Sequence, residues 1–354
     1  MKSGPQRDAD RLPPRITIKD IAARAGVSIG AVSYALNGRP GVSEATRLRV
    51  LTVAEELGWV PDNAARRLAG AQTETVGLVL TSGTAKSLGV APWFMEFIGG
   101  VATVLAEHGY GMMMQVVSDI DAEIEVYRKW ARSRLVDGVI LVDLRSADPR
   151  VGAVRSLRLP AVIAGPPEVA QGFACVWTND GAAAQEAVRY LAALGHHDLA
   201  RVSGPAEMMH VKIRQAATAQ VATELGLRVR TWFTDYSVEL GRRATREILM
   251  SSPRPTAILY DDDLGAVTGL AVARELNLRI PEDVSLLAWD DSNLCQTTFP
   301  PLSAMSHDVL GYGAHVTRRL LEVLGGAAPA AHQDVTPRIT PRASTAPPGS
   351  KSGT

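Results

Sequence analysis

From residue 75 to about residue 345 the sequence alternates short apolar stretches with longer amphipathic ones, and this alternation constrains the fold most strongly. Residues 76–80 predict a buried strand, and residues 93–108 predict an amphipathic helix that ends at Gly109. Continuous apolar strands separated by helices are typical of a parallel sheet covered on both faces. The pattern restarts near residue 178, so we expect two such α/β units in tandem. Further strands are expected at 111–117, 138–142, 161–164, 199–203, 228–233, 256–260 and 284–289, and further helices at 122–134, 181–194, 210–225, 238–250, 264–276 and 308–324.

The first seventy residues follow a different pattern, that of short helices with small apolar residues. Thr17 and Asp20 resemble a capping box, in which the Thr17 hydroxyl accepts from an early backbone N–H and Asp20 favours the helix N-terminus. Gly26 ends this first helix, because glycine adopts the left-handed conformation cheaply. A second helix is expected at residues 29–36 after a Ser28 cap, and a third between Ser43 and Gly58.

Two short helices joined by a glycine-containing turn are typical of a helix-turn-helix, here within a three-helix head. An ordinary helical hairpin has the same spacing. Residues 1–70 contain 11 Lys or Arg and seven Asp or Glu residues, a net charge of +4, so the remainder carries −4. A basic end on an acidic body suits a protein that presents that end to a polyanion, although many solvated surfaces show a similar difference.

The continuous stretch ITIKDIAARAGVSIGAVSYALNGRPGVSEATRLRVLTVAEELGWVPDNAARRLAG resembles the DNA-binding headpiece of the LacI/GalR family of bacterial repressors. The segments LGHHDLARVSGP, LRIPEDVSLLAWDD and FPPLSAM resemble that family's effector domain, which is similar to periplasmic sugar-binding proteins. The resemblance implies an α/β chain with an all-α helix-turn-helix headpiece followed by two doubly wound parallel-sheet subdomains. It also implies a transcription regulator, most simply a repressor, which binds a palindromic operator as a homodimer and responds to a small-molecule effector. A sugar is the expected effector; purines and nucleosides remain alternatives, as do induction and corepression.

The domain boundaries that follow are a disordered tail at 1–15, a headpiece at 16–61, a hinge helix and linker at 62–73 and an effector and dimerisation domain at 74–345. Within the last domain we expect subdomains formed by 74–177 plus 305–328 and by 178–304 plus 329–345. Residues 346–354 are expected to form a second disordered tail.

The resemblance assigns DNA-binding positions on the second helix and around it. Ile29, Gly30 and Tyr34 occupy the base-reading positions, where the family often carries long polar side chains that this sequence lacks. Ile29 would contact a thymine methyl group, Gly30 would allow close backbone approach, and Tyr34 would donate to a base or a phosphate. The phosphate-contacting positions are Thr17, Ser28, Ser33, Asn37, Ser43 and Thr46, with Lys19 adding a cationic contact. Thr17, Ser28 and Ser43 would also be present as helix caps without any DNA.

Residues 62–70 match the family's hinge helix. Asn63 and Arg66 lie on its polar side, and Leu68 matches the leucine that wedges between base pairs at the operator centre. A segment this short cannot hold a helix alone in water, so we expect it to order only as a pair on DNA. Alternatively, it is a linker helix whose Leu68 packs on its own domain.

Polar residues at predicted strand ends are the candidates for an effector site, because ligands of open α/β sheets bind beyond the carboxyl ends of the strands. Arg214 matches the family's effector-binding arginine, Asp262 stands where the family usually has asparagine, and Asp290 matches an effector-binding aspartate. Trp289 is expected to stack on a sugar face. Phe94 and His307 complete the predicted set. Taken without the resemblance, Arg214 would be a solvated helix residue and Trp289 plain core.

Other function classes have less support. Asp261, Asp262 and Asp263 after a strand would suit Mg²⁺, but no phosphate-cradling GxxxxGK[ST] loop, HExxH or CxxC motif accompanies them. An enzyme that turns over a phosphorylated sugar with magnesium is the alternative, and a free-standing transport receptor is a third. No metal or cofactor is expected. Neither a secretory signal nor a transmembrane stretch is recognisable, and two isolated cysteines suit a reducing compartment, so a cytoplasmic location without membrane contact is expected.

Overall fold

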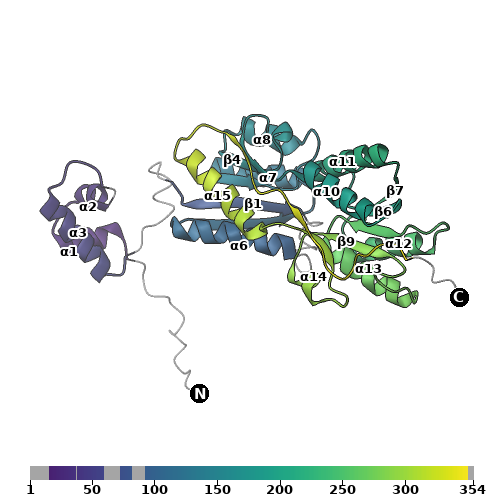
Figure 1. Cartoon of the computed structure of the whole chain (residues 1–354). Helices are drawn as coiled ribbons and strands as arrows, with labels where there is room; N and C mark the ends of the chain where they lie inside the picture. The colour runs from purple at the N-terminus through teal and green to yellow at the C-terminus, as the bar shows by residue number, and fades with distance from the viewer. Residues whose placement is uncertain (1–15, 37, 60–71, 82–91, 350–354) are drawn as a thin grey trace, which may run out of the picture. The chain divides into compact units, whose positions relative to one another are not determined.

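The computed structural model of the chain describes residues 16–36, 38–59, 72–81 and 92–349. It divides into two compact units, Met1–Ala71 and Gln72–Thr354 (Figure 1). Each unit has its own hydrophobic core. Among the described residues, no helix is both long and apolar enough to cross a membrane.

The smaller unit contains three helices, α1 (Ile18–Ala25), α2 (Ile29–Leu36) and α3 (Glu44–Glu56). One fully buried residue of each helix, Ile21, Val32 and Val50, meets the others in its core. Asp20 accepts hydrogen bonds from the backbone N–H (2.8 Å) and the hydroxyl (2.7 Å) of Thr17, which hold the start of α1. These bonds lower the pKa of Asp20, the side-chain bond most. Gly26 has a left-handed backbone (φ 66°) and ends the same helix, as the sequence predicts.

The larger unit contains two six-stranded sheets. The first has the strand order β11-β5-β4-β3-β1-β2, and all of its neighbouring strands are parallel. Its strands are β1 (Thr75–Thr81), β2 (Gly111–Val117), β3 (Gly138–Leu141), β4 (Ala161–Ala164), β5 (Ala174–Trp177) and β11 (Ala331–Gln333). Its helices are α6 (Pro92–Glu107), α7 (Ile120–Ser133), α8 (Pro149–Ser156), α9 (Pro167–Ala170) and α15 (Val309–Leu324).

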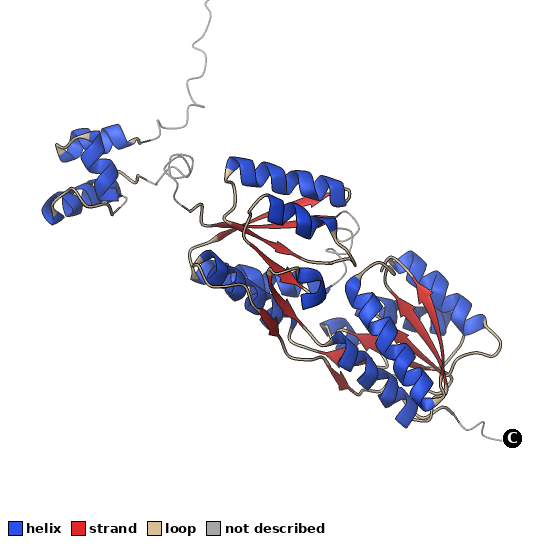
Figure 2. Cartoon of the chain, turned by 90° about the horizontal axis from the view of Figure 1, so that it is seen from above, coloured by secondary structure: helices blue, strands red, loops and turns tan. Residues whose placement is uncertain are grey.

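The second sheet has the order β12-β10-β9-β8-β6-β7, and only its edge strand β12 runs antiparallel to its neighbour. Its strands are β6 (Asp198–Ser203), β7 (Arg228–Phe233), β8 (Ala257–Tyr260), β9 (Ser285–Trp289), β10 (Ser303–Ser306) and β12 (Arg338–Thr340). The remaining helices are α10 (Asp180–Ala193), α11 (Met209–Leu225), α12 (Val238–Met250), α13 (Asp263–Glu275) and α14 (Asn293–Thr297). Helices cover both faces of each sheet (Figure 2). The predicted fold class, an all-α headpiece with two tandem α/β halves, is confirmed.

The chain passes from the first sheet to the second after β5, returns after β10 and passes again after β11. This corrects two expectations. Residues 329–345 do not all belong to the second half, because residues 331–333 form β11 and pair with β5 in the first sheet. The ordered chain also extends beyond residue 345, since the Ala346 backbone N–H donates to the Ser285 hydroxyl at 3.1 Å.

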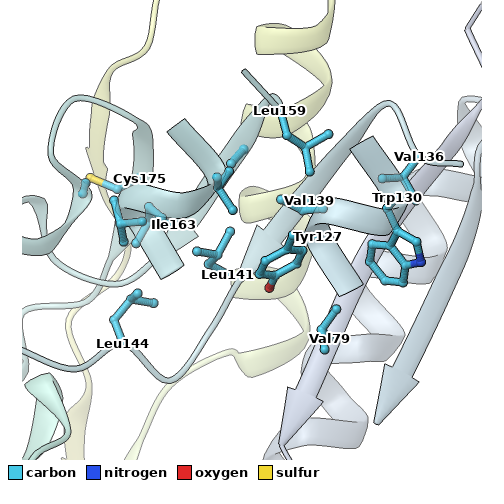
Figure 3. Close-up of a cluster of buried hydrophobic side chains, with 14 of the residues drawn as sticks. Val79, Tyr127, Trp130, Val136, Val139, Leu141, Leu144, Leu159, Ile163 and Cys175 are labelled. Atoms are coloured by element: carbon cyan, nitrogen blue, oxygen red, sulfur yellow. The ribbon is translucent and has the colours of Figure 1, made fainter. Parts of the chain in front are cut away.

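Aromatic side chains of α7 pack in the core of the first half (Figure 3). Trp130 and Tyr127 are 1% and 0% exposed and pack against Val79 and Val139 of the sheet. Gly77 in β1 makes room for this packing, because a Cβ atom there would lie 2.4 Å from the Trp130 ring. The large side chain and the glycine therefore form one packing unit.

Two glycines allow α6 and α15 to cross closely beside the first sheet. A Cβ atom on Gly100 of α6 would lie 2.0 Å from the Leu310 carbonyl oxygen, and one on Gly313 of α15 would lie 2.2 Å from that of Phe97. The backbones of the two helices are thus in direct contact at this crossing, which ties α15, late in the sequence, to the first half.

Candidate functional site

A cavity of about 320 Å³ lies between the two sheets of the larger unit, beyond the carboxyl ends of their strands. Residues that follow β3, β4 and β5 line it from one sheet, and residues that follow β6, β8 and β9 line it from the other. Its position is the one where α/β sheets bind ligands, and its size falls in the usual range for small-molecule sites. All six residues predicted for an effector site line this cavity: Phe94, Arg214, Asp262, Trp289, Asp290 and His307.

Arg214 on α11 is held firmly at the cavity wall. Its Nη2 and Nε lie 2.8 and 2.9 Å from Oδ1 of Asp180, and its Nη1 donates to the Asp261 carbonyl oxygen at 3.2 Å. Burial opposes the guanidinium charge, but Asp180 and Asp261 more than offset this effect and raise the pKa of Arg214. The side chain is 11% exposed, so Arg214 is a positioned buried cation and not a solvated helix residue.

The expected stacking of Trp289 on a ligand is wrong for this structure. Trp289 is 1% exposed, and the Arg214 guanidinium carbon lies 3.7 Å from its ring centroid. A guanidinium over an indole face is itself a favourable contact, so the ring supports Arg214 instead of offering a free face. Trp93 and Trp177 are half-buried and line the cavity, which makes them the better candidates for stacking.

Asp262 and Asp290 follow β8 and β9 at the second wall. Burial, with Asp263 and Asp261 nearby, raises the pKa of Asp262 to about 7. Burial and Asp263 also raise the pKa of Asp290 well above its ordinary value. Asp290 has a left-handed backbone (φ 65°), which is uncommon for a residue other than glycine and is characteristic of functional sites.

His307, at the crossing from β10 to α15, faces Asp290. Its Nδ1 lies 3.9 Å from the Asp290 Oδ1, and its side chain is 7% exposed. Burial lowers the pKa of His307 and favours the neutral ring. Within the described residues this Nδ1 has no hydrogen-bond partner, so it is a buried polar atom at the cavity that lacks a contact.

A buried ion pair that is not among the predicted site residues supports this wall. Arg201 on β6 is 0% exposed, and its Nε and Nη2 donate to the Asp261 carboxylate at 2.8 and 2.5 Å. Ser203 donates to the same carboxylate at 2.5 Å. The available signal was an arginine inside an otherwise apolar strand, because a buried cation requires a partner. Asp180 was also missed, although it follows a strand as Asp262 and Asp290 do.

The contacts of Asp261 and Asp263 do not support a metal site at residues 261–263. Asp261 is occupied by Arg201, and Asp263 accepts from the Leu264 backbone N–H at 2.7 Å. Across the described parts of the chain, no group of three or more His, Cys, Asp or Glu residues is arranged to hold a metal ion.

In the smaller unit, α2 exposes the residues predicted to read bases. Ile29 is 45% and Tyr34 is 44% exposed, which is high for large apolar and aromatic side chains. A Cβ atom on Gly30 would meet only the Ser28 hydroxyl, at 3.9 Å, so the backbone there is open to close approach. The Tyr34 ring lies over Gly41, where a Cβ atom would be 3.0 Å away.

The predicted phosphate-contacting residues flank α2, and several of them also cap helices. Ser28 accepts from the Ala31 backbone N–H at 3.1 Å, and Ser43 accepts from that of Thr46 at 3.3 Å. Thr17 and Asp20 form the predicted capping box, and the Thr17 hydroxyl also donates to the Asp20 carboxylate. Their capping roles are therefore present without DNA. Lys19 is exposed and Ser33 half-buried. Asn37, Asn63, Arg66 and Leu68 lie outside the described residues.

Both parts of the chain match known protein families. Residues 17–62 match the family described as bacterial regulatory proteins, lacI family, and residues 188–345 match the periplasmic binding protein-like domain. The HTH-type transcriptional repressor PurR of Erwinia tasmaniensis is 30% identical over 294 residues, which cover 82% of this chain and 84% of that protein.

Solved structures show the same architecture. The transcriptional regulator CelR in complex with cellobiose superposes with a TM-score of 0.71 at 27% identity, covering 93% of this chain and 100% of CelR. The lac repressor dimer bound to operator and the anti-inducer ONPF gives a TM-score of 0.80 at 24% identity, covering 94% and 99% of the two chains. The second likeness concerns the fold alone.

Proposed function

Since the chain belongs to the lacI family of bacterial regulatory proteins, we propose that it is a transcriptional repressor that binds a palindromic operator as a homodimer under effector control. The observation that carries the proposal is the pairing, in one chain, of an exposed helix α2 with a partly buried polar cavity between two α/β halves. PurR, a relative of similar length, is named as a repressor.

On the DNA side, α2 is the recognition helix. Ile29 contacts a thymine methyl group, Gly30 lets the backbone approach, and Tyr34 donates from its hydroxyl to a base or a phosphate. Lys19, Asn37, Thr46 and the other flanking residues set the register on phosphates. With no long amide or guanidinium on the exposed positions of α2, we expect sequence preference to rest more on apolar contacts and DNA shape.

On the effector side, Arg214, Asp262 and Asp290 bind polar groups of a small ligand, and Phe94, Trp93 and Trp177 cover its apolar faces. Trp289 acts through Arg214. CelR binds a disaccharide in a fold of this kind, which supports a sugar or a similar polar metabolite as the ligand. Because the cavity is lined by residues from both sheets, a ligand bound there changes how the two halves face each other, and through them the two headpieces of a dimer.

The operator can be selected from a random palindromic DNA library with the full-length protein, and its affinity then measured by gel shift at several salt concentrations. Each phosphate contact releases counterions, so we expect affinity to fall by roughly 10³–10⁵ between 50 and 200 mM salt for about 6–10 phosphate contacts. Random DNA of equal length and charge is the control. Failure to enrich any sequence, or equal affinity for selected and random DNA, would contradict the proposal.

A further inference from the structure

Acidic side chains outnumber basic ones among the residues that line the cavity. Seven carboxylates and two guanidinium groups belong to the residues that line it. Three of these carboxylates are matched by arginines, in the pairs Asp180–Arg214, Asp261–Arg201 and Glu207–Arg145. The guanidinium of Arg214 is therefore already compensated, and that of Arg145, 39% exposed, lies 4.0 Å from Glu207 at a solvated position. Neither arginine is left as a free anchor for an anionic ligand.

Asp262 and Asp290 are the inner carboxylates that lack such a match. Both are half-buried, and no Lys or Arg of the described chain pairs with either of them. Asp263, 3% exposed, adds a further acidic side chain beside them. A buried carboxylate without a cation is unfavourable, and raised pKa values at Asp262 and Asp290 are the expected result.

His307 supplies an independent sign that a ligand group is missing. Its buried Nδ1 lies 3.9 Å from Asp290 Oδ1, too far for a hydrogen bond between them. When the proton of the neutral imidazole lies on Nε2, the Nδ1 atom and an ionised carboxylate oxygen are both acceptors. An ammonium group has three N–H donors and no acceptor, so one such group can donate to both atoms and still reach a third. A hydroxyl has a single proton and satisfies only one of them.

We propose that the effector carries a protonated amine, which lies between Asp290 and His307 with Asp262 close by, on a polar scaffold such as an amino sugar or an aminonucleoside. This rests on the proposed function, since it names the ligand class of the same site. Anionic ligands are selected against by the surplus of carboxylates. A neutral hydroxyl donates to only one of the two acceptors and gives an ionised Asp290 no cationic partner.

The experiment compares ligands that share a scaffold and differ in charge. The probes are D-glucosamine, D-glucose and D-glucuronate, and 5′-amino-5′-deoxyadenosine, adenosine and adenosine 5′-monophosphate, titrated calorimetrically into the full-length protein at pH 7. We expect the amine to bind at least tenfold more tightly than the neutral member in one of the series. Asp290→Asn should reduce that preference to less than threefold. Glu282→Gln, which removes an exposed carboxylate near the opposite end of β9, should keep it.

Tighter binding of the neutral or the acidic member in both series would overturn the amine assignment, and so would binding of none of the amines. Gel shifts on the selected operator separate this result from the proposed function. If the protein binds its operator and releases it with a neutral or acidic ligand, the regulator function stands and only the amine is wrong. If an amine binds but no sequence-specific DNA is found, the ligand class stands and the regulator function falls.

Discussion

Asp261 and Asp262 are adjacent at the end of β8, yet their surroundings move their pKa values in opposite directions. Burial alone would raise both. Arg201 and Arg214 reverse the effect at Asp261 and lower its pKa, whereas neighbouring carboxylates add to it at Asp262. One side chain is thus a charged structural anchor, and the other changes protonation near neutral pH. The two aspartates differ in role because Asp261 has a cationic partner in Arg201 and Asp262 has none among the described residues.

This difference predicts opposite effects of two isosteric substitutions on stability at pH 8. Asp262 binds its proton more tightly in the folded state, so its contribution to stability falls as the pH rises from 3.8 to about 7 and stays low above that. Asp262→Asn should therefore stabilise the unliganded protein by about 1–3 kcal/mol at pH 8 and have little effect at pH 4. Urea denaturation at both pH values measures this.

Asp261→Asn is the matched comparison. The lowered pKa of Asp261 means that its contribution is present above the ordinary value of 3.8 and is lost as the pH falls through the folded-state value. Removing its charge leaves Arg201 buried without a counter-ion and should cost about 3–5 kcal/mol at pH 8. If both variants shift stability in the same direction, the electrostatic description of this wall is wrong.

Strand ends and the family resemblance together predict six residues that line one cavity. They do not predict how these residues pair. Trp289 was expected to face a ligand, but Arg214 covers its ring, and that contact depends on the relative placement of β9 and α11. The sequence does not predict Asp261 as the partner of Arg201, because nothing local shows that β6 lies next to β8.

At the scale of elements, the glycine crossing of α6 and α15 fixes how closely the two helices approach. Two adjacent glycines of α6, Gly99 and Gly100, allow a matched pair of alanine substitutions, because only one of them lies at the crossing. A Cβ atom on Gly100 would meet the Leu310 backbone at 2.0 Å, whereas one on Gly99 has only the Leu310 side chain within reach, at 4.0 Å. Gly100→Ala should destabilise the protein by about 1–3 kcal/mol through overpacking. Gly99→Ala should be neutral or stabilise it by up to about 1 kcal/mol, because alanine favours the helix.

Thermal and urea unfolding of the two alanine variants measure this difference directly. Equal stability of Gly99→Ala and Gly100→Ala would show that the helices separate easily at the crossing. Such freedom would disagree with the close backbone contact in the structure.

Most elements were predictable because their periodicity is local. The predicted helix 29–36 matches α2, and the predicted strand 111–117 matches β2. The strands β5, β10, β11 and β12 and the helices α8, α9 and α14 are not among the predicted elements. The strands β11 and β12 each have three residues that are exposed or half-buried, so neither carries an apolar pattern, and they form strands only through their neighbours in space.

At the scale of the whole molecule, the two halves of the larger unit touch beside the cavity. The Met209 backbone N–H donates to the Leu144 carbonyl oxygen at 2.8 Å, and Arg145 pairs with Met208 in an isolated antiparallel bridge. These contacts join the segment after β3 to the segment after β6. A covalent link between these two segments would therefore fix the relative position of the halves at this point.

A disulfide between Arg145→Cys and Met208→Cys should lock the halves in this arrangement. The native cysteines, Cys175 and Cys295, are both buried, and burial raises their thiol pKa values, so they should not compete. Oxidation should change operator affinity by about 5–150-fold, the usual range of allosteric coupling, and dithiothreitol should reverse the change. Fluorescence polarisation with labelled operator measures both states, and the two single-cysteine variants are the controls. Unchanged affinity of the oxidised protein would mean that the halves do not communicate with the headpiece.

The late strand β11 also determines the order in which the protein can be completed during translation. Its residues pair with β5, more than 150 positions earlier, so the edge of the first sheet stays open until nearly the whole chain has left the ribosome. At about 5–20 residues per second this delay is roughly 8–30 s, while the headpiece has no such dependence. A chain that terminates early therefore contains every residue of α1, α2 and α3 but lacks the last strand of the first sheet.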